Sequence, residues 1–174
     1  MTILPYLSTY VQGAKFRLGS ISPENEGTIS AGANKSTVTF SGALDPSSDP
    51  DSTSSIAVVS YGHVAVFSTE SASDGVGMVT GVNAWSSSGL GVTQLVSTMQ
   101  ISMPLRAGVG ALQDRQHTEE GTYPQCSFWS EDRGVWHDSG MILEAVEVGD
   151  DDMATVSCQT NHLSTFSPLL GNSS

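Results

Sequence analysis

Short stretches in which apolar and polar residues alternate recur along the chain, and they predict β-strands. The longest runs from Val92 to Leu105. Successive side chains of a strand point to opposite faces, so one face of this stretch is predicted to be the core face. That face carries Thr93, Leu95, Ser97, Met99, Ile101 and Met103. No apolar set recurs at helical spacing over three turns, so we expect almost no helix.

The remaining predicted strands are shorter and are separated by turns rich in Gly, Pro and Ser. They are Val11–Leu18, Thr37–Phe40, Ile56–Phe67 as a bulged strand or a hairpin, one short strand between Ser68 and Gly91, Ser127–Ser130, Met141–Val148, Ala154–Cys158 and Leu163–Leu169. Polar connectors are expected at residues 45–51 and 106–123, and a hairpin turn at 148–153. With 174 residues, 18 Gly and 7 Pro, the chain is predicted to be a single all-β domain spanning residues 1–174.

Charge narrows the range of partners. Six Lys and Arg residues against 18 Asp and Glu residues give a net charge of −12. Such a surface repels phosphate backbones and anionic membranes, so we expect no nucleic-acid binding.

The first residues lack a basic start and a long apolar run, so we expect this sequence to be a trimmed part of a longer protein.

The two cysteines, Cys126 and Cys158, are 32 positions apart and are either buried reduced thiols or a disulfide. The low-Lys, Ser/Thr-rich surface suits an extracellular protein and favours the disulfide. Sequons at Asn34 and Asn172 are compatible with secretion. Together with His137 and His162 the cysteines could ligate zinc, but no short Cys-X2-Cys or His-X3-His spacing supports this, so no metal is expected. Nothing in the sequence calls for a cofactor.

A cluster of residues near the C-terminus forms a recognisable motif. It comprises Cys126, Phe128, Trp129, Trp136, Gly140, Cys158 and the run Asn161, His162, Leu163, Ser164, Thr165 and Phe166. Together these residues resemble the GPS autoproteolysis motif that ends the GAIN domain of adhesion receptors and polycystin-like proteins. The specific resemblance covers about 45 residues, taken as 126–170, whereas the preceding residues agree only in being strand-rich.

The resemblance implies an extracellular antiparallel β-sandwich like the β subdomain of a GAIN domain. The family usually has four cysteines, bridged first to third and second to fourth. Cys126 and Cys158 stand at the first and third positions, which implies a disulfide between them. Met141 and Thr160 stand at the second and fourth positions, so both partners of the other bridge are missing. Trp129 and Trp136 are expected to pack around the bridge or to shape the cleavage turn.

The resemblance also implies self-cleavage between Leu163 and Ser164. His162 as base would deprotonate Ser164, whose oxygen would attack the Leu163 carbonyl in an N-to-O acyl shift followed by ester hydrolysis. This is a single-turnover reaction and not multiple-turnover enzymology. The strand 164–174 would stay bound non-covalently through Phe166, Leu169 and Leu170, as a candidate tethered agonist.

Two further expectations concern the parent protein: a membrane anchor after this segment, and an extracellular protein ligand. The alternative to self-cleavage is an uncut structural or adhesion module of the same fold, in which His162 and Ser164 are only turn residues. The missing second bridge is the sequence feature that favours this alternative.

Overall fold

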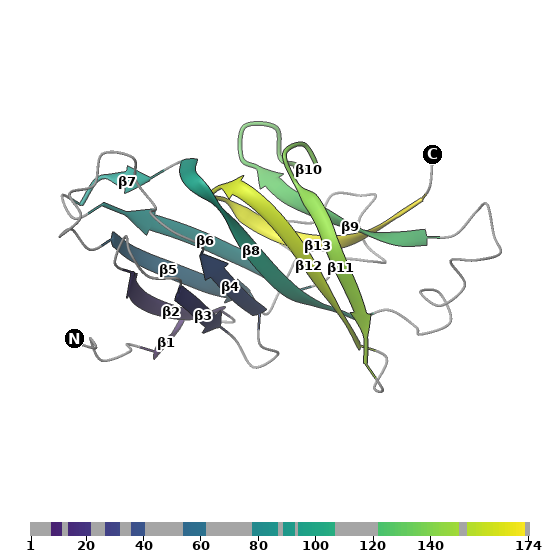
Figure 1. Ribbon diagram of the computed structural model, residues 1–174, viewed down its shortest axis with the longest axis horizontal. Helices are drawn as coiled ribbons and strands as arrows, with labels where there is room; N and C mark the ends of the chain where they lie inside the picture. The colour runs from purple at the N-terminus through teal and green to yellow at the C-terminus, as the bar shows by residue number, and fades with distance from the viewer. Residues whose placement is uncertain are drawn as a thin grey trace.

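The computed structural model describes residues 8–11, 14–21, 27–31, 36–40, 54–61, 78–86, 89–92, 94–106, 122–149 and 153–172. Within these ranges all regular structure is β-strand (Figure 1). The strands are β1 (Ser8–Val11), β2 (Ala14–Ile21), β3 (Gly27–Ala31), β4 (Ser36–Phe40), β5 (Ser54–Tyr61), β6 (Val79–Trp85), β7 (Gly91–Val92), β8 (Gln94–Arg106), β9 (Thr122–Ser130), β10 (Val135–His137), β11 (Ile142–Val148), β12 (Met153–His162) and β13 (Thr165–Asn172).

The strands form two antiparallel sheets that face each other in a sandwich (Figure 1). The first sheet has the order β1-β2-β5-β6-β13-β9-β10, with β7 paired to β6. The second has the order β11-β12-β8-β4-β3. The prediction of an all-β antiparallel sandwich is therefore confirmed.

Strand β8 is the centre of the second sheet, between β12 and β4. Its core face is the one that the alternation predicts. Leu95, Met99, Ile101 and Met103 are buried, and Leu105 continues the same face. Gln94, Val96, Thr98 and Gln100 on the other face are exposed. The period-2 pattern was a sufficient guide here because a sheet that packs on one side buries only alternate residues.

Several predicted strand boundaries are wrong. The predicted strand Val92–Leu105 does not begin at Val92, which belongs to β7 and pairs with Ala84 in the first sheet, whereas β8 begins at Gln94 in the second. Val11 and Ala14 pair with each other at the end of two antiparallel strands, so the chain reverses between them and the predicted strand Val11–Leu18 is split into β1 and β2. The predicted strand Leu163–Leu169 begins two residues late, at Thr165, because the chain changes sheets at Leu163 and Ser164. Elsewhere β9 and β12 contain and extend the predicted segments, whereas β11 begins at Ile142, one residue after the predicted start at Met141.

Several predictions fall outside the described residues. These are the polar loop 45–51, most of the connector 106–123, residues 62–67 of the predicted hairpin, the tip of the turn 148–153, and the sequon at Asn34. The base of that turn is described, and there Gly149 N–H donates to the Met153 carbonyl across 2.8 Å. Asn172 is the last residue of β13.

Cys126 and Cys158 form a disulfide, as the resemblance implied. Cys126 lies on β9 in the first sheet and Cys158 on β12 in the second, so the bond ties the two layers of the sandwich together. Both residues belong to a single buried cluster that also contains Phe166, Met99 and Ile101. The disulfide is therefore part of the core.

The C-terminal strand β13 lies inside the first sheet, between β6 and β9 (Figure 1). It pairs with β9 from Phe166–Phe128 to Asn172–Thr122 and with β6 at Thr165 and Phe166. Phe166 is fully buried, and Leu170 packs against the core four residues further on. Leu169 lies on the opposite face and is half-buried. Of the three predicted anchors, Phe166 and Leu170 thus contact the core.

Replacing both cysteines by alanine is expected to lower the free energy of unfolding by roughly 3–4 kcal/mol, because the bridge closes a loop of 32 residues in the unfolded chain. Urea unfolding of the double variant, compared with the parent chain in the presence and absence of reductant, measures this loss. An identical unfolding midpoint for the oxidised and reduced parent chain would contradict the expectation.

Candidate functional site at the sheet crossover

The segment Leu163–Ser164 carries the chain from one sheet to the other. Strand β12 ends at His162 in the second sheet, and β13 begins at Thr165 in the first. Two residues therefore make the whole crossing. On the far side, the Val82 N–H of β6 donates to the Ser164 carbonyl across 2.8 Å. The peptide bond between Leu163 and Ser164 is thus held between anchored strands on both sides.

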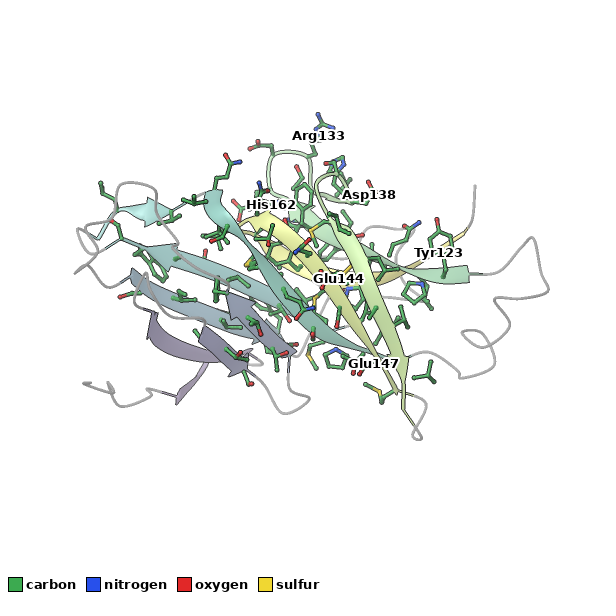
Figure 2. The ribbon with its side chains drawn as sticks, viewed as in Figure 1. Tyr123, Arg133, Asp138, Glu144, Glu147 and His162 are labelled. Atoms are coloured by element: carbon green, nitrogen blue, oxygen red, sulfur yellow. A yellow bond between two sulfur atoms is a disulfide. The ribbon has the colours of Figure 1, made fainter. Side chains whose placement is uncertain are left out.

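His162 lies at the end of β12, at the same end of the sandwich as the loops that carry Arg133 and Asp138 (Figure 2). Its imidazole is half-buried among aromatic rings. The Phe128 ring lies 4.5 Å from it between centroids in an edge-to-face arrangement, and the Phe166 ring lies at 5.6 Å. Burial disfavours the charged form and lowers the pKa of His162 below 6.5. The ring is therefore neutral at pH 7 and can accept a proton.

The two ring nitrogens of His162 have different surroundings. Nδ1 lies 2.7 Å from the hydroxyl Oγ1 of Thr160, a residue that is buried on the same strand. The His162 backbone N–H donates to the same oxygen across 3.4 Å. Nε2 is buried and has no hydrogen-bond partner among the described residues. The Thr160 hydroxyl is thus hydrogen-bonded to Nδ1, whereas Nε2 has no such bond within the described residues.

Ser164 does not touch His162 through a hydrogen bond in this structure. Its hydroxyl donates to the Trp129 carbonyl oxygen across 3.2 Å. The chemistry implied by the motif requires the hydroxyl to leave this carbonyl and turn toward the imidazole. Rotation about the Cα–Cβ bond of one serine is the smallest movement that can redirect it.

The two tryptophans of the motif stand opposite each other on neighbouring strands, Trp129 on β9 and Trp136 on β10. Their rings lie 5.4 Å apart between centroids in an edge-to-face arrangement. Trp129 also reaches the crossover, since its carbonyl holds the Ser164 hydroxyl. Trp129 therefore contacts the crossover through its backbone carbonyl, while its ring packs on Trp136.

Gly140 approaches His162 from the loop between β10 and β11. Its φ of 76° lies in the left-handed region, and the Met141 N–H closes the turn onto the Asp138 carbonyl across 3.0 Å. A Cβ built on Gly140 would lie 3.9 Å from His162 Nδ1. This motif glycine therefore serves the turn and lies against the imidazole.

The remaining motif residues take different positions. Asn161 is exposed at the end of β12, whereas Thr165 is half-buried and pairs with Gly81. Phe166 is fully buried and closes the aromatic surroundings of His162. Sequence reasoning overlooked Val82, because nothing in the sequence shows which residue of a distant strand will face the crossover. It treated Thr160 only as the place of a missing cysteine.

The structure excludes a zinc site that uses the two cysteines as ligands. Both cysteines are consumed by the disulfide, so neither can supply a thiolate ligand. In the described part of the chain, no group of three His, Cys, Asp or Glu residues is arranged to hold a metal ion.

Comparison with known families agrees with this geometry. The family model described as GPS: GAIN subdomain B matches residues 9–174. The chain therefore belongs to the GAIN subdomain B family, and the family match extends far beyond the 45 residues of the motif. No curated protein gives a significant match to the chain. None of the residues described forms a helix long and apolar enough to cross a bilayer.

Replacing Gly140 by alanine should destabilise the fold by about 1 kcal/mol or more, because a side chain is strained at positive φ. It should also shift the NMR signals of the His162 ring. Gly134→Ala is the matched control: Gly134 has a φ of 64° and open space around its Cβ position. We expect a similar loss of stability there with no change at His162. Equal perturbation of His162 by both variants would contradict a specific contact with Gly140.

Proposed function

We propose that this domain cleaves its own backbone between Leu163 and Ser164. The observation that carries the proposal is the crossover itself. The family's cleavage tripeptide, His162-Leu163-Ser164, coincides with the two-residue passage between the sheets, with a neutral, half-buried imidazole at its start. Membership of the GAIN subdomain B family supports the same reaction.

The reaction proceeds in two steps. His162 takes the proton from the Ser164 hydroxyl, and the oxygen attacks the Leu163 carbonyl carbon. The bond from that carbon to the Ser164 nitrogen breaks, and the nitrogen takes up the proton. This leaves an ester between Leu163 and the Ser164 oxygen together with a free amine on Ser164. Water then cleaves the ester, giving a Leu163 carboxylate and restoring the Ser164 hydroxyl.

Proximity lowers the activation barrier of this reaction. Nucleophile and carbonyl belong to adjacent residues, so no translational entropy is lost in bringing them together, an advantage worth up to about 7–11 kcal/mol in well-oriented systems. The anchors on both sides restrict the crossover further: Val82 holds the Ser164 carbonyl, and Thr160 holds His162. The remaining movement is the release of the Ser164 hydroxyl from the Trp129 carbonyl.

Cleavage would not release the C-terminal strand. β13 is an interior strand with β9 along one edge and β6 along part of the other. Phe166 is fully buried, which alone contributes about 1.5–3 kcal/mol to retention. The strand 164–174 would therefore remain as a non-covalent part of the sheet. A strand held in this way is able to act as a tethered agonist if the parent protein pulls it out.

The family and the disulfide both bear on where the protein is located. Domains of this family are typically extracellular portions of membrane receptors, and the disulfide requires an oxidising compartment. We therefore assign the domain to the cell surface, within a parent protein that is anchored in the membrane after this segment. An extracellular protein is the expected ligand class.

The second candidate is an uncut adhesion module of the same fold. The hydrogen bond from the Ser164 hydroxyl to the Trp129 carbonyl favours it, because the hydroxyl is bonded to this carbonyl and not to the imidazole. In that case His162 and Ser164 would only shape the crossover, and the chain would keep a single mass indefinitely.

Denaturing mass spectrometry separates the two candidates. We expect two products, residues 1–163 and 164–174, that co-purify under native conditions and separate on denaturation. Ser164→Ala and His162→Ala should remain folded and uncut, because each removes one reacting group. Ser164→Thr should still cut, because it keeps a hydroxyl at the same place. A single full-length mass for the parent chain after long incubation near pH 8 would sink the proposal.

The rate of cleavage should depend on pH through His162. Since burial lowers the pKa of His162 below 6.5, the ring stays neutral to a lower pH than a free histidine. The rate is therefore expected to change little between pH 8 and pH 7 and to fall to half only below pH 6.5. The measurement is the cleaved fraction against time at each pH, with circular dichroism to verify folding. A half-maximal point above pH 6.5 would contradict a desolvated base.

A further inference from the structure

We infer that Thr160 positions the general base, by accepting a hydrogen bond from His162 Nδ1–H and thereby leaving Nε2 free to take the proton of Ser164. This inference rests on the proposed self-cleavage and adds a residue to it. Thr160 hydrogen-bonds to His162 and supplies no reacting atom, so it is a positioning residue.

The first support is geometric. Thr160 is 3% exposed, and its Oγ1 lies 2.7 Å from His162 Nδ1. The same oxygen accepts the His162 backbone N–H across 3.4 Å. A hydroxyl oxygen has two acceptor lone pairs, so it can receive both of these donors. Because threonine is branched at Cβ, its hydroxyl has little rotational freedom at a buried strand position.

The second support is the position of the single ring proton of neutral His162. If the Thr160 hydroxyl donated to Nδ1, the neutral ring would carry its proton on Nε2, and neither nitrogen would have a lone pair available for Ser164. If Nδ1–H donates to Thr160 instead, Nε2 keeps its lone pair. Nε2 is buried and has no hydrogen-bond partner in the described part of the chain, so it is the nitrogen that remains available. The second arrangement is the reactive one.

The protonated ring of His162 also requires an acceptor at Nδ1. Once His162 has taken the Ser164 proton, both of its nitrogens carry hydrogen and both must donate. Thr160 Oγ1 is the oxygen already within hydrogen-bond distance of Nδ1. Thr160 therefore stabilises the imidazolium that forms during the attack. In other nucleophilic sites a third residue orients the base in the same way.

The position of Thr160 in the sheet explains why a hydroxyl is present there. Thr160 stands where the family usually has its fourth cysteine. Ile142 pairs with Gln159 and Leu143 with Cys158, so the next step of this register places Met141 opposite Thr160. These are the two positions of the missing bridge. The chain thus has, beside the base, a hydrogen-bonding side chain in place of a disulfide sulfur.

The test compares two substitutions of Thr160 in a pulse–chase measurement of cleavage. Thr160→Val keeps the shape and branching but removes the hydroxyl, and we expect it to slow cleavage about 10- to 100-fold. Thr160→Ser restores the hydroxyl and should recover most of the rate. Thr155→Val, an exposed position on the same strand, is the matched control and should cut at the parent rate.

A second measurement reports on the ring itself. In the uncut Ser164→Ala chain labelled with ¹⁵N-histidine, His162 is expected to show a protonated Nδ1 and an unprotonated Nε2. Adding Thr160→Val should abolish this preference, whereas adding Thr160→Ser should keep it. A merely structural role for Thr160 would not change the tautomer.

Three results would overturn the inference: an unchanged or faster rate for Thr160→Val, a slow Thr160→Ser chain, or a ring protonated on Nε2 in the labelled chain. Absence of cleavage in the parent chain would instead overturn the proposed function, together with the role inferred here. The two failures are therefore distinguishable.

Discussion

The disulfide between Cys126 and Cys158 is the constraint on which the rest of this domain depends, because it joins β12, which leads into the crossover, to β9, which lies beside it in the other sheet. Cys126 lies on β9, which also carries Phe128 and Trp129. Cys158 lies on β12, two residues before Thr160 and four before His162. The covalent bond fixes the separation of the sheets at this point. Aromatic rings from one layer therefore stay in contact with the imidazole of the other.

That contact gives His162 its chemical character. Phe128 and Phe166 come from the first sheet and exclude water from a ring that belongs to the second. The resulting desolvation lowers the pKa of His162 and keeps the ring neutral. The same packing buries Phe166 and so holds the C-terminal strand. In the proposed reaction, the neutral state of the base and the retention of the strand would thus depend on the same few aromatic side chains.

The Ser164 carbonyl and the Ser164 hydroxyl, the proposed nucleophile, are held by different hydrogen bonds at the crossover. Val82 fixes the Ser164 carbonyl, whereas the Trp129 carbonyl holds the Ser164 hydroxyl by one hydrogen bond of 3.2 Å. A neutral hydrogen bond contributes only about 0.5–1.5 kcal/mol net, so the hydroxyl can leave it readily. In the proposed reaction, breaking this one hydrogen bond is the first movement that the Ser164 hydroxyl must make.

The sequence by itself determined the all-β class and the core face of β8, both of which follow from the period of the apolar residues. The motif and the Cys126–Cys158 pairing came from the resemblance to the GPS motif, which the paired absence of the other two cysteines supported. Only the tertiary structure decided where the chain changes sheets, which residue of β6 anchors Ser164, and what Thr160 contacts. A strand pattern carries no information about which layer the strand joins, so Leu163–Ser164 reads as a continuous strand until both sheets are placed. Likewise, Thr160 looks like a lost cysteine until its hydroxyl is found 2.7 Å from His162 Nδ1.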